Sequence, residues 1–189
     1  MRKNVSGNRS KPAAHTVQTV GRSAEAAAAS DSSLSLEGKK APVFVLPDRE
    51  GRRVALKDLL SQGNLVLYFY PKDMTPGCTT EACGFRDRID EIRTRDAVVA
   101  GISGDSSGSH MKFADKYALN FPLLSDPDFR VAKAYGVYKK KKLYGREFMG
   151  IERTTFLIDQ NGKIRKVFPK VKVNGHVDEI IGALADLKP

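Results

Sequence analysis

The only two thiols of the chain, Cys78 and Cys83, lie five residues apart. They follow an apolar run over residues 65–70, which is typical of a buried strand. Thr75 and Pro76 form a helix-start signal, because a hydroxyl residue suits the N-cap and proline suits the first helical position. Cys78 then falls in the first turn of a helix, where unpaired N–H groups and the helix dipole stabilise an anion. A thiol so placed should ionise more readily than a free one, and the thiolate is the reactive form.

The number and spacing of the cysteines argue against several other uses of sulfur. Two cysteines are too few for the disulfide framework of a small secreted protein. With no histidine near them in the sequence, they do not form a set of zinc ligands. Their spacing also differs from the Cys-x-x-Cys of thioredoxin-type disulfide reductases. We therefore expect a redox-active pair in a reducing compartment, with no metal, haem or flavin.

The segment around Cys78 also resembles a known family. Pro71, Thr75 and Cys78 fit the Pro-x-x-x-Thr-x-x-Cys signature of the peroxiredoxins, and the similarity runs over about residues 36–187. The second cysteine, at Cys83, is similar in position to that of the subgroup called bacterioferritin comigratory protein or peroxiredoxin Q. Further blocks agree in order and spacing: 101–105, the Leu-Leu-Ser-Asp that ends at Asp126, and 153–159. The resemblance implies a thioredoxin-like fold and a peroxidase that reduces hydrogen peroxide and organic hydroperoxides.

The resemblance also implies roles for individual residues. Cys78 would be the peroxidatic nucleophile, Pro71 would shield its thiolate, and Arg153 would provide a fixed positive charge with several donors. Sequence alone could not have chosen this arginine from the many in the chain. The Thr75 hydroxyl can cap the helix or donate to thiolate or peroxide. For Glu81 two interpretations stay open, a hydrogen bond within the site or a surface carboxylate near the helix N-terminus.

Attack on a peroxide would leave a sulfenic acid on Cys78, and a nearby thiol would condense with it to a disulfide. Cys83 is the only other thiol and is the expected resolving residue within one subunit, with a single-cysteine mechanism as the alternative. Five residues along an ideal helix separate two Cα atoms by about 8.7 Å, whereas a disulfide needs about 4.4–6.8 Å. If residues 78–83 are helical in the reduced protein, the helix must unwind before the bond can form.

Electrons would come from an external dithiol protein, and the resemblance points to thioredoxin. Because the subgroup commonly works as a monomer, we expect a monomer. One alternative is a general thiol–disulfide oxidoreductase; another is a redox-sensing or polyanion-binding protein that uses the same disulfide as a switch. The four lysines over 139–142 could hold phosphates or act as a localisation signal. A short charge run is usually a solvated loop, however, and with no nucleic-acid fold signature we do not expect a nucleic-acid partner.

The length of 189 residues and 41% hydrophobic content favour a single domain with a core. Residues 1–36 are rich in Ser, Ala, Arg and Lys and are interpreted as a disordered basic extension, with a transit peptide as the alternative. The folded domain would then span 37–189. The net charge of +10 favours acidic partners. No apolar run is long enough to cross a bilayer. A cytoplasmic setting, bacterial or other, is the default expectation and agrees with a redox-active cysteine pair, whereas a plastid or nuclear destination would require the extension to be a targeting segment.

Hydrophobic periodicity predicts an α/β domain with a central mixed sheet flanked by helices. An Asn161-Gly162 turn predicts a late hairpin. The basic segment over 138–148 is expected to be a loop, and His15, His110 and His176 are expected at the surface. The predicted strands are 43–46, 53–56, 65–70, 97–102, 154–158 and 163–168. The predicted helices are 81–94, with its start signal at Thr75, then 107–117, 129–135 and 177–187.

Overall fold

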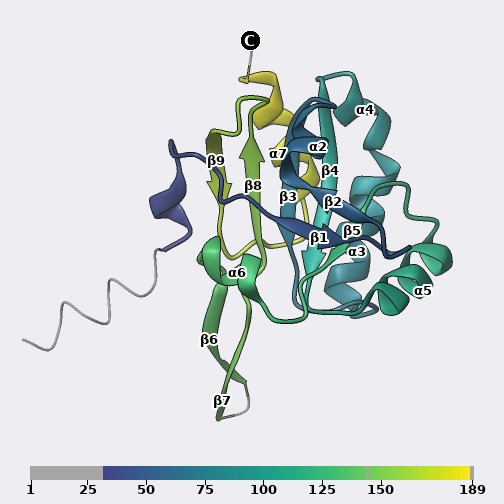
Figure 1. Cartoon of the computed structure of the whole chain (residues 1–189), viewed down its shortest axis with the longest axis vertical. Coiled ribbons are helices and arrows are strands. Elements are labelled where there is room, and N and C mark those ends of the chain that lie inside the picture. The colour runs from purple at the N-terminus through teal and green to yellow at the C-terminus, as the bar shows by residue number, and fades with distance from the viewer. Residues whose placement is uncertain (1–31, 144, 188–189) are drawn as a thin grey trace, which may run out of the picture. The chain divides into compact units, whose positions relative to one another are not determined.

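The computed structural model describes residues 32–143 and 145–187 (Figure 1). A five-stranded sheet in the order β5-β4-β3-β8-β9 forms its centre. The first three strands in this order are mutually parallel, whereas β8 and β9 complete the sheet with antiparallel pairings. The prediction of a mixed sheet in an α/β fold is therefore confirmed. The strands are β3 (Asn64–Phe69), β4 (Ala97–Ser103), β5 (Leu123–Ser125), β8 (Thr154–Ile158) and β9 (Ile164–Phe168).

Helices cover both faces of this sheet, as Figure 1 shows. One face packs against α3 (Pro76–Asp87), α4 (Ile89–Arg93), α5 (Ser107–Tyr117) and α7 (His176–Ala185). The other face packs against α2 (Leu56–Leu60), α6 (Arg130–Ala134) and the hairpin of β1 (Val45–Pro47) and β2 (Arg53–Ala55). A short turn, η1 (Leu34–Leu36), contributes Leu36 to this second layer.

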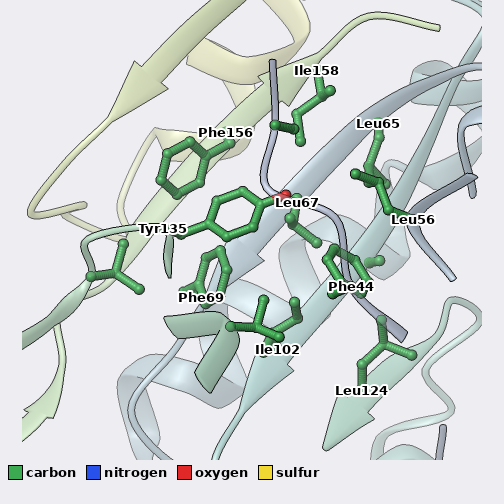
Figure 2. Packing of buried hydrophobic residues seen from close by; sticks show 14 of the residues in the cluster. Phe44, Leu56, Leu65, Leu67, Phe69, Ile102, Leu124, Tyr135, Phe156 and Ile158 are labelled. Carbon is green, nitrogen blue, oxygen red and sulfur yellow. The ribbon is translucent and has the colours of Figure 1, made fainter. Parts of the chain in front are cut away.

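Strand β3 supplies both hydrophobic cores because successive side chains of a strand point to opposite faces. Leu65, Leu67 and Phe69 enter the core that Figure 2 shows, where Phe69 lies beside Tyr135 and Phe156. The alternate residues of β3 enter the other core, which also contains Cys78. Since both faces are buried, the strand reads as a continuous apolar run. The cysteine segment thus follows directly on a strand that is buried on both faces.

The helix predicted over 81–94 is in fact two helices, because α3 ends at Asp87 and α4 begins at Ile89. Arg88 between them has φ −111° and ψ 12°, which is not helical. Its guanidinium holds the break by pairing with Glu91 and with Asp178 of α7. The periodicity could not reveal the break because the apolar stripe continues across it.

The loop predicted over the basic segment is wrong, because these residues form a second hairpin. Strands β6 (Tyr138–Leu143) and β7 (Arg146–Ile151) pair in antiparallel register and extend beyond the central sheet (Figure 1). Three of the four lysines have partners in the hairpin or directly beside it. Lys139 pairs with Glu152 at 2.7 Å, Lys140 pairs with Glu147, and the Lys141 Nζ donates to the Ile151 carbonyl at 2.8 Å.

The prediction of a disordered extension over 1–36 falls mostly outside the described residues, and so does His15. Ser33, at the edge of that range, is buried, and the Ser32 hydroxyl donates to the Gly136 carbonyl at 2.9 Å. Within the part of the chain that the structure describes, no helix is long and apolar enough to span a membrane.

Candidate active site

The register of the central sheet brings the cysteine segment and Arg153 to one edge. Phe69, the last residue of β3, pairs with Thr154, the first residue of antiparallel β8. The loop that leaves β3 and the residue that precedes β8 therefore meet, although 75 residues separate Cys78 from Arg153 along the chain. The sheet topology thus explains how distant sequence blocks form one site.

The start of α3 follows the predicted signal, with one difference. Thr75 is the N-cap residue and Pro76 occupies the first turn. The Thr75 hydroxyl makes no capping hydrogen bond; it donates instead to the Lys72 carbonyl at 3.1 Å. The N–H groups in the first turn of α3, where Cys78 lies, are therefore left without a side-chain cap from Thr75 and can act on an anion.

A guanidinium contacts the sulfur of Cys78. The Arg153 Nη2 donates to the Cys78 Sγ at 3.3 Å, and Nη1 pairs with the Glu81 carboxylate. A Cβ on Gly77 would lie 3.2 Å from Nη2, so the glycine leaves room for this approach. Although burial alone would lower it, the Glu81 carboxylate and the Cys78 sulfur raise the pKa of Arg153 above its usual value. The site therefore has a fixed positive charge beside the sulfur of Cys78, a residue that is only 1% exposed.

Glu81 lies inside the site, and the surface interpretation of this residue is wrong. Its side chain is completely buried, one helical turn beyond Cys78. Burial raises the pKa of Glu81 to about 7, and the charge of Arg153 only partly opposes this effect. The Glu81 Oε1 has no hydrogen-bond partner within the described residues. Glu81 is therefore a buried partner of Arg153, and a pKa of about 7 means that its charge changes near neutral pH.

Both cysteines are free, with Cys78 buried and Cys83 half-buried. All residues from 78 to 83 belong to α3. At ideal helix geometry their Cα atoms are about 8.7 Å apart, beyond the reach of a disulfide. Residues 78–83 are thus helical in the protein with free thiols, so the helix must unwind before a disulfide can form. The unwinding itself stays a prediction. Pro71 is exposed at the start of the loop, and its shielding role also stays a prediction.

The prediction of surface histidines is wrong for the two that the structure describes. His110 is completely buried in α5, and its Nδ1 lies 2.9 Å from the Asp73 Oδ2. His176, 1% exposed, lies in the first turn of α7, and its Nε2 is 2.8 Å from the Thr155 hydroxyl. Burial lowers the pKa of His176, although Glu179 opposes the shift.

Sequence reasoning missed Asp73 entirely, although it lies within the cysteine segment. A weak signal for its partner was present, because His110 shares the apolar stripe of α5 with Phe113, Ala114 and Tyr117. A histidine on an apolar face needs a buried partner. Only the structure shows that this partner lies 37 residues earlier.

Comparison with known proteins agrees with the site. The model of the AhpC/TSA family matches residues 37–167. Peroxiredoxin Bcp of Bacillus subtilis is 50% identical over 150 residues, which covers 79% of this chain and 95% of the relative. Peroxiredoxin Bcp of Escherichia coli K12 is 46% identical over 149 residues, with 79% and 95% covered.

Solved structures give the same result. The bacterioferritin comigratory protein of Xanthomonas campestris, studied in trapped intermediate and ligand complexes, superposes with a TM-score of 0.71 at 40% identity. The match covers 76% of this chain and 90% of that one. The family match spans most of the chain. It agrees with the geometry of the site, in which the buried Cys78 at the start of α3 accepts a hydrogen bond from Arg153. The chain therefore belongs to the AhpC/TSA family and is a peroxiredoxin, a thiol peroxidase.

Proposed function

We propose that Cys78 is the peroxidatic residue of this enzyme. Its thiolate attacks one peroxide oxygen, so that a sulfur–oxygen bond forms as the oxygen–oxygen bond breaks. The sulfur is oxidised by two electrons to a sulfenic acid, and the departing oxygen takes a proton and leaves as water or an alcohol. Arg153 and the N-terminal N–H groups of α3 stabilise the negative charge that moves from sulfur to the leaving oxygen. The observation that carries this proposal is the 3.3 Å hydrogen bond from Arg153 to the buried sulfur.

We further propose that Cys83 resolves the sulfenic acid. Its thiol forms a disulfide with Cys78 and releases water. A thioredoxin-like dithiol protein then reduces this disulfide and is itself oxidised to a disulfide. Thr75 and Pro71 bound the peroxide-binding space, and Glu81 holds Arg153 in place. Because both cysteines belong to one helix, the cycle can be completed by a single chain, which supports a monomer.

Organic hydroperoxides are proposed as substrates together with hydrogen peroxide. The bacterioferritin comigratory protein of Xanthomonas campestris, which has alkyl peroxide reduction activity, is 40% identical to this chain. We also propose a cytoplasmic location, because the peroxiredoxins Bcp of Bacillus subtilis and Escherichia coli are bacterial relatives and a free pair of thiols suits a reducing compartment.

Peroxide consumption by the purified full chain with a thioredoxin recycling system tests the cysteine roles. Cys78→Ser is expected to abolish turnover because it removes the nucleophile. Cys83→Ser is expected to lose turnover with thioredoxin but to recover it with a small thiol, which can reduce the sulfenic acid directly. Turnover that survives Cys78→Ser would overturn the proposal, and full thioredoxin-dependent turnover in Cys83→Ser would leave a single-cysteine mechanism.

A further inference from the structure

A buried carboxylate lies within the loop that carries the cysteine. The side chain of Asp73, 2% exposed, accepts hydrogen bonds from three groups. The Tyr70 hydroxyl donates to Oδ1 at 2.7 Å, and the Ser109 hydroxyl donates to Oδ2 at 2.7 Å. His110 Nδ1 lies 2.9 Å from Oδ2. Although burial alone would raise it, these three donors hold the pKa of Asp73 below its usual value. The carboxylate is therefore a charged, fully engaged centre inside the protein.

The geometry fixes what His110 contributes. Because an ionised carboxylate only accepts hydrogen bonds, the proton of this contact is on Nδ1. The other ring nitrogen, Nε2, is buried and has no hydrogen-bond partner within the described residues. Nδ1 of His110 thus binds the loop through Asp73, whereas Nε2 makes no hydrogen bond within the described residues.

This network ties the loop to two other elements. Ser109 and His110 belong to the first turn of α5. The Asp73 backbone N–H donates to Asp105 Oδ2 at 2.9 Å, and that oxygen also accepts from Ser103 at the end of β4. The loop between Tyr70 and Thr75 is therefore bound through both the side chain and the main chain of a single residue.

The backbone next to Asp73 is strained. Met74 has φ +61°, in the left-handed region that residues with a Cβ rarely adopt. Such a conformation persists where the surroundings determine it, and it is common at functional sites. Asp73 on one side and the start of α3 on the other hold Met74 in this conformation.

We propose that Asp73 is a positioning residue of the peroxidase: its network fixes the loop and the first turn of α3 while the residues that follow Cys78 unwind. This inference rests on the proposed two-cysteine mechanism. The peroxide must meet a defined arrangement of Thr75, Cys78 and Arg153, whereas disulfide formation requires α3 to loosen around Cys83. The hydrogen-bond network of Asp73 allows both, because it holds the loop that precedes Cys78 in place while the helix that follows Cys78 unwinds.

The reaction with peroxide and the formation of the disulfide should therefore respond differently when the hydrogen-bond network of Asp73 is weakened. Asp73→Asn keeps the shape of the side chain but removes the charge that three donors satisfy. The second-order rate constant for peroxide should fall at least about tenfold, because a small misplacement of reacting groups is costly. The first-order rate of disulfide formation from the sulfenic acid should stay within about twofold, since that step does not need the fixed loop.

His110 offers a matched pair of variants. An asparagine side chain places its amide nitrogen near the position of Nδ1, whereas glutamine places it near Nε2. Since only Nδ1 has a partner, His110→Asn should stay within about twofold of the wild-type peroxide rate constant and His110→Gln should fall at least about fivefold. Ser109→Ala removes one donor and should give a smaller loss. Asp115→Asn, an exposed site on the same helix, is the control and should change neither rate.

The experiment measures both steps on the full chain. Competition with a haem peroxidase for hydrogen peroxide gives the peroxide rate constant. Rapid quenching with dimedone, followed by mass spectrometry, gives the decay of sulfenic acid to disulfide. Equal losses in both rates for Asp73→Asn, no loss in the peroxide rate, or an equal loss in His110→Asn and His110→Gln would each overturn the inference. The wild-type arm separates the two proposals, because without a sulfenic acid on Cys78 the proposed function itself fails.

Discussion

At the scale of single residues, the proposed reactivity of Cys78 centres on one guanidinium that has two partners. Arg153 donates to the sulfur with one nitrogen and pairs with Glu81 through the other. A lysine could not hold both partners in one plane. Because the pKa of Glu81 is about 7, the charge that balances Arg153 changes near neutral pH. The protonation of Glu81 therefore affects both the charge beside Cys78 and the stability of the fold.

That link gives a prediction for stability. The pKa of Glu81 rises from 4.5 to about 7 on folding. Between these values the unfolded chain has lost the proton and the folded chain keeps it, so the contribution of Glu81 to stability is present below pH 4.5 and lost as the pH rises to about 7. Glu81→Gln cannot titrate and should not show this loss, which is on the order of 3 kcal/mol.

Urea unfolding of both proteins at several pH values between 4 and 8 measures this difference. The stability of Glu81→Gln relative to wild type should increase between pH 4.5 and about 7 and then stay level. Glu91→Gln, an exchange at a carboxylate on α4 that pairs with Arg88, controls for the loss of a titratable group nearer the surface. A difference between wild type and Glu81→Gln that does not change with pH would contradict a raised pKa.

The sequence identified the residues of the site that the family motif contains. Cys78, Thr75 and Pro71 could be nominated from a local pattern, and Arg153 from the resemblance. Asp73 and His110 could not be paired, because their contact depends on how α5 packs beside the loop, and no local periodicity records that. The orientation of the Thr75 hydroxyl, toward the Lys72 carbonyl, also depends on the loop conformation.

At the scale of elements, α3 is a helix with weak intrinsic preference. Two glycines, Gly77 and Gly84, each cost about 1 kcal/mol relative to alanine. Both have a packing reason, since a Cβ on Gly77 would approach Arg153 and one on Gly84 would lie 3.1 Å from the Val177 side chain. Thr79 and Thr80 lower the preference further. A helix that is stabilised by packing rather than by propensity can unwind locally when the formation of the Cys78–Cys83 disulfide compensates for the lost contacts.

Hydrogen exchange tests the unwinding. Backbone amides of residues 79–84 should exchange at least about tenfold faster in the disulfide form than in the reduced form, because local opening exposes them. The amides of α5 serve as the internal control and should not change. Equally slow exchange at 79–84 in both forms would mean that the disulfide forms without unwinding, against the geometry of an ideal helix.

Elements with strong periodicity were predicted well, and the failures have physical causes. Residues 107–117 form the helix that their pattern predicts, and the buried strand at 65–70 was recognised from its continuous apolar run. The β6–β7 hairpin was missed because a strand of four lysines has no hydrophobic alternation. The hairpin is stabilised by cross-strand pairs and by the Lys140–Glu147 ion pair, which hydrophobic periodicity does not predict.

At the scale of the whole molecule, the net charge of +10 invites contact with polyanions. The lysines of β6 are its most concentrated feature, yet Lys139 and Lys140 pair with glutamates and Lys141 donates to a backbone carbonyl. An electrostatic footprint for nucleic acid requires charges that are free to replace counterions. We therefore expect any DNA binding to be diffuse and not to centre on this hairpin.

The salt dependence of DNA binding tests that expectation. A variant with Lys140→Gln and Lys142→Gln and a control with Lys112→Gln and Lys116→Gln each remove two exposed positive charges. If binding is diffuse, both double variants should lower the slope of log affinity against log salt by the same small amount, less than about one. A dedicated site in the hairpin would lose about two units of slope in the first variant alone. That outcome would show that the hairpin, which extends from a peroxidase fold, is a polyanion-binding element in its own right.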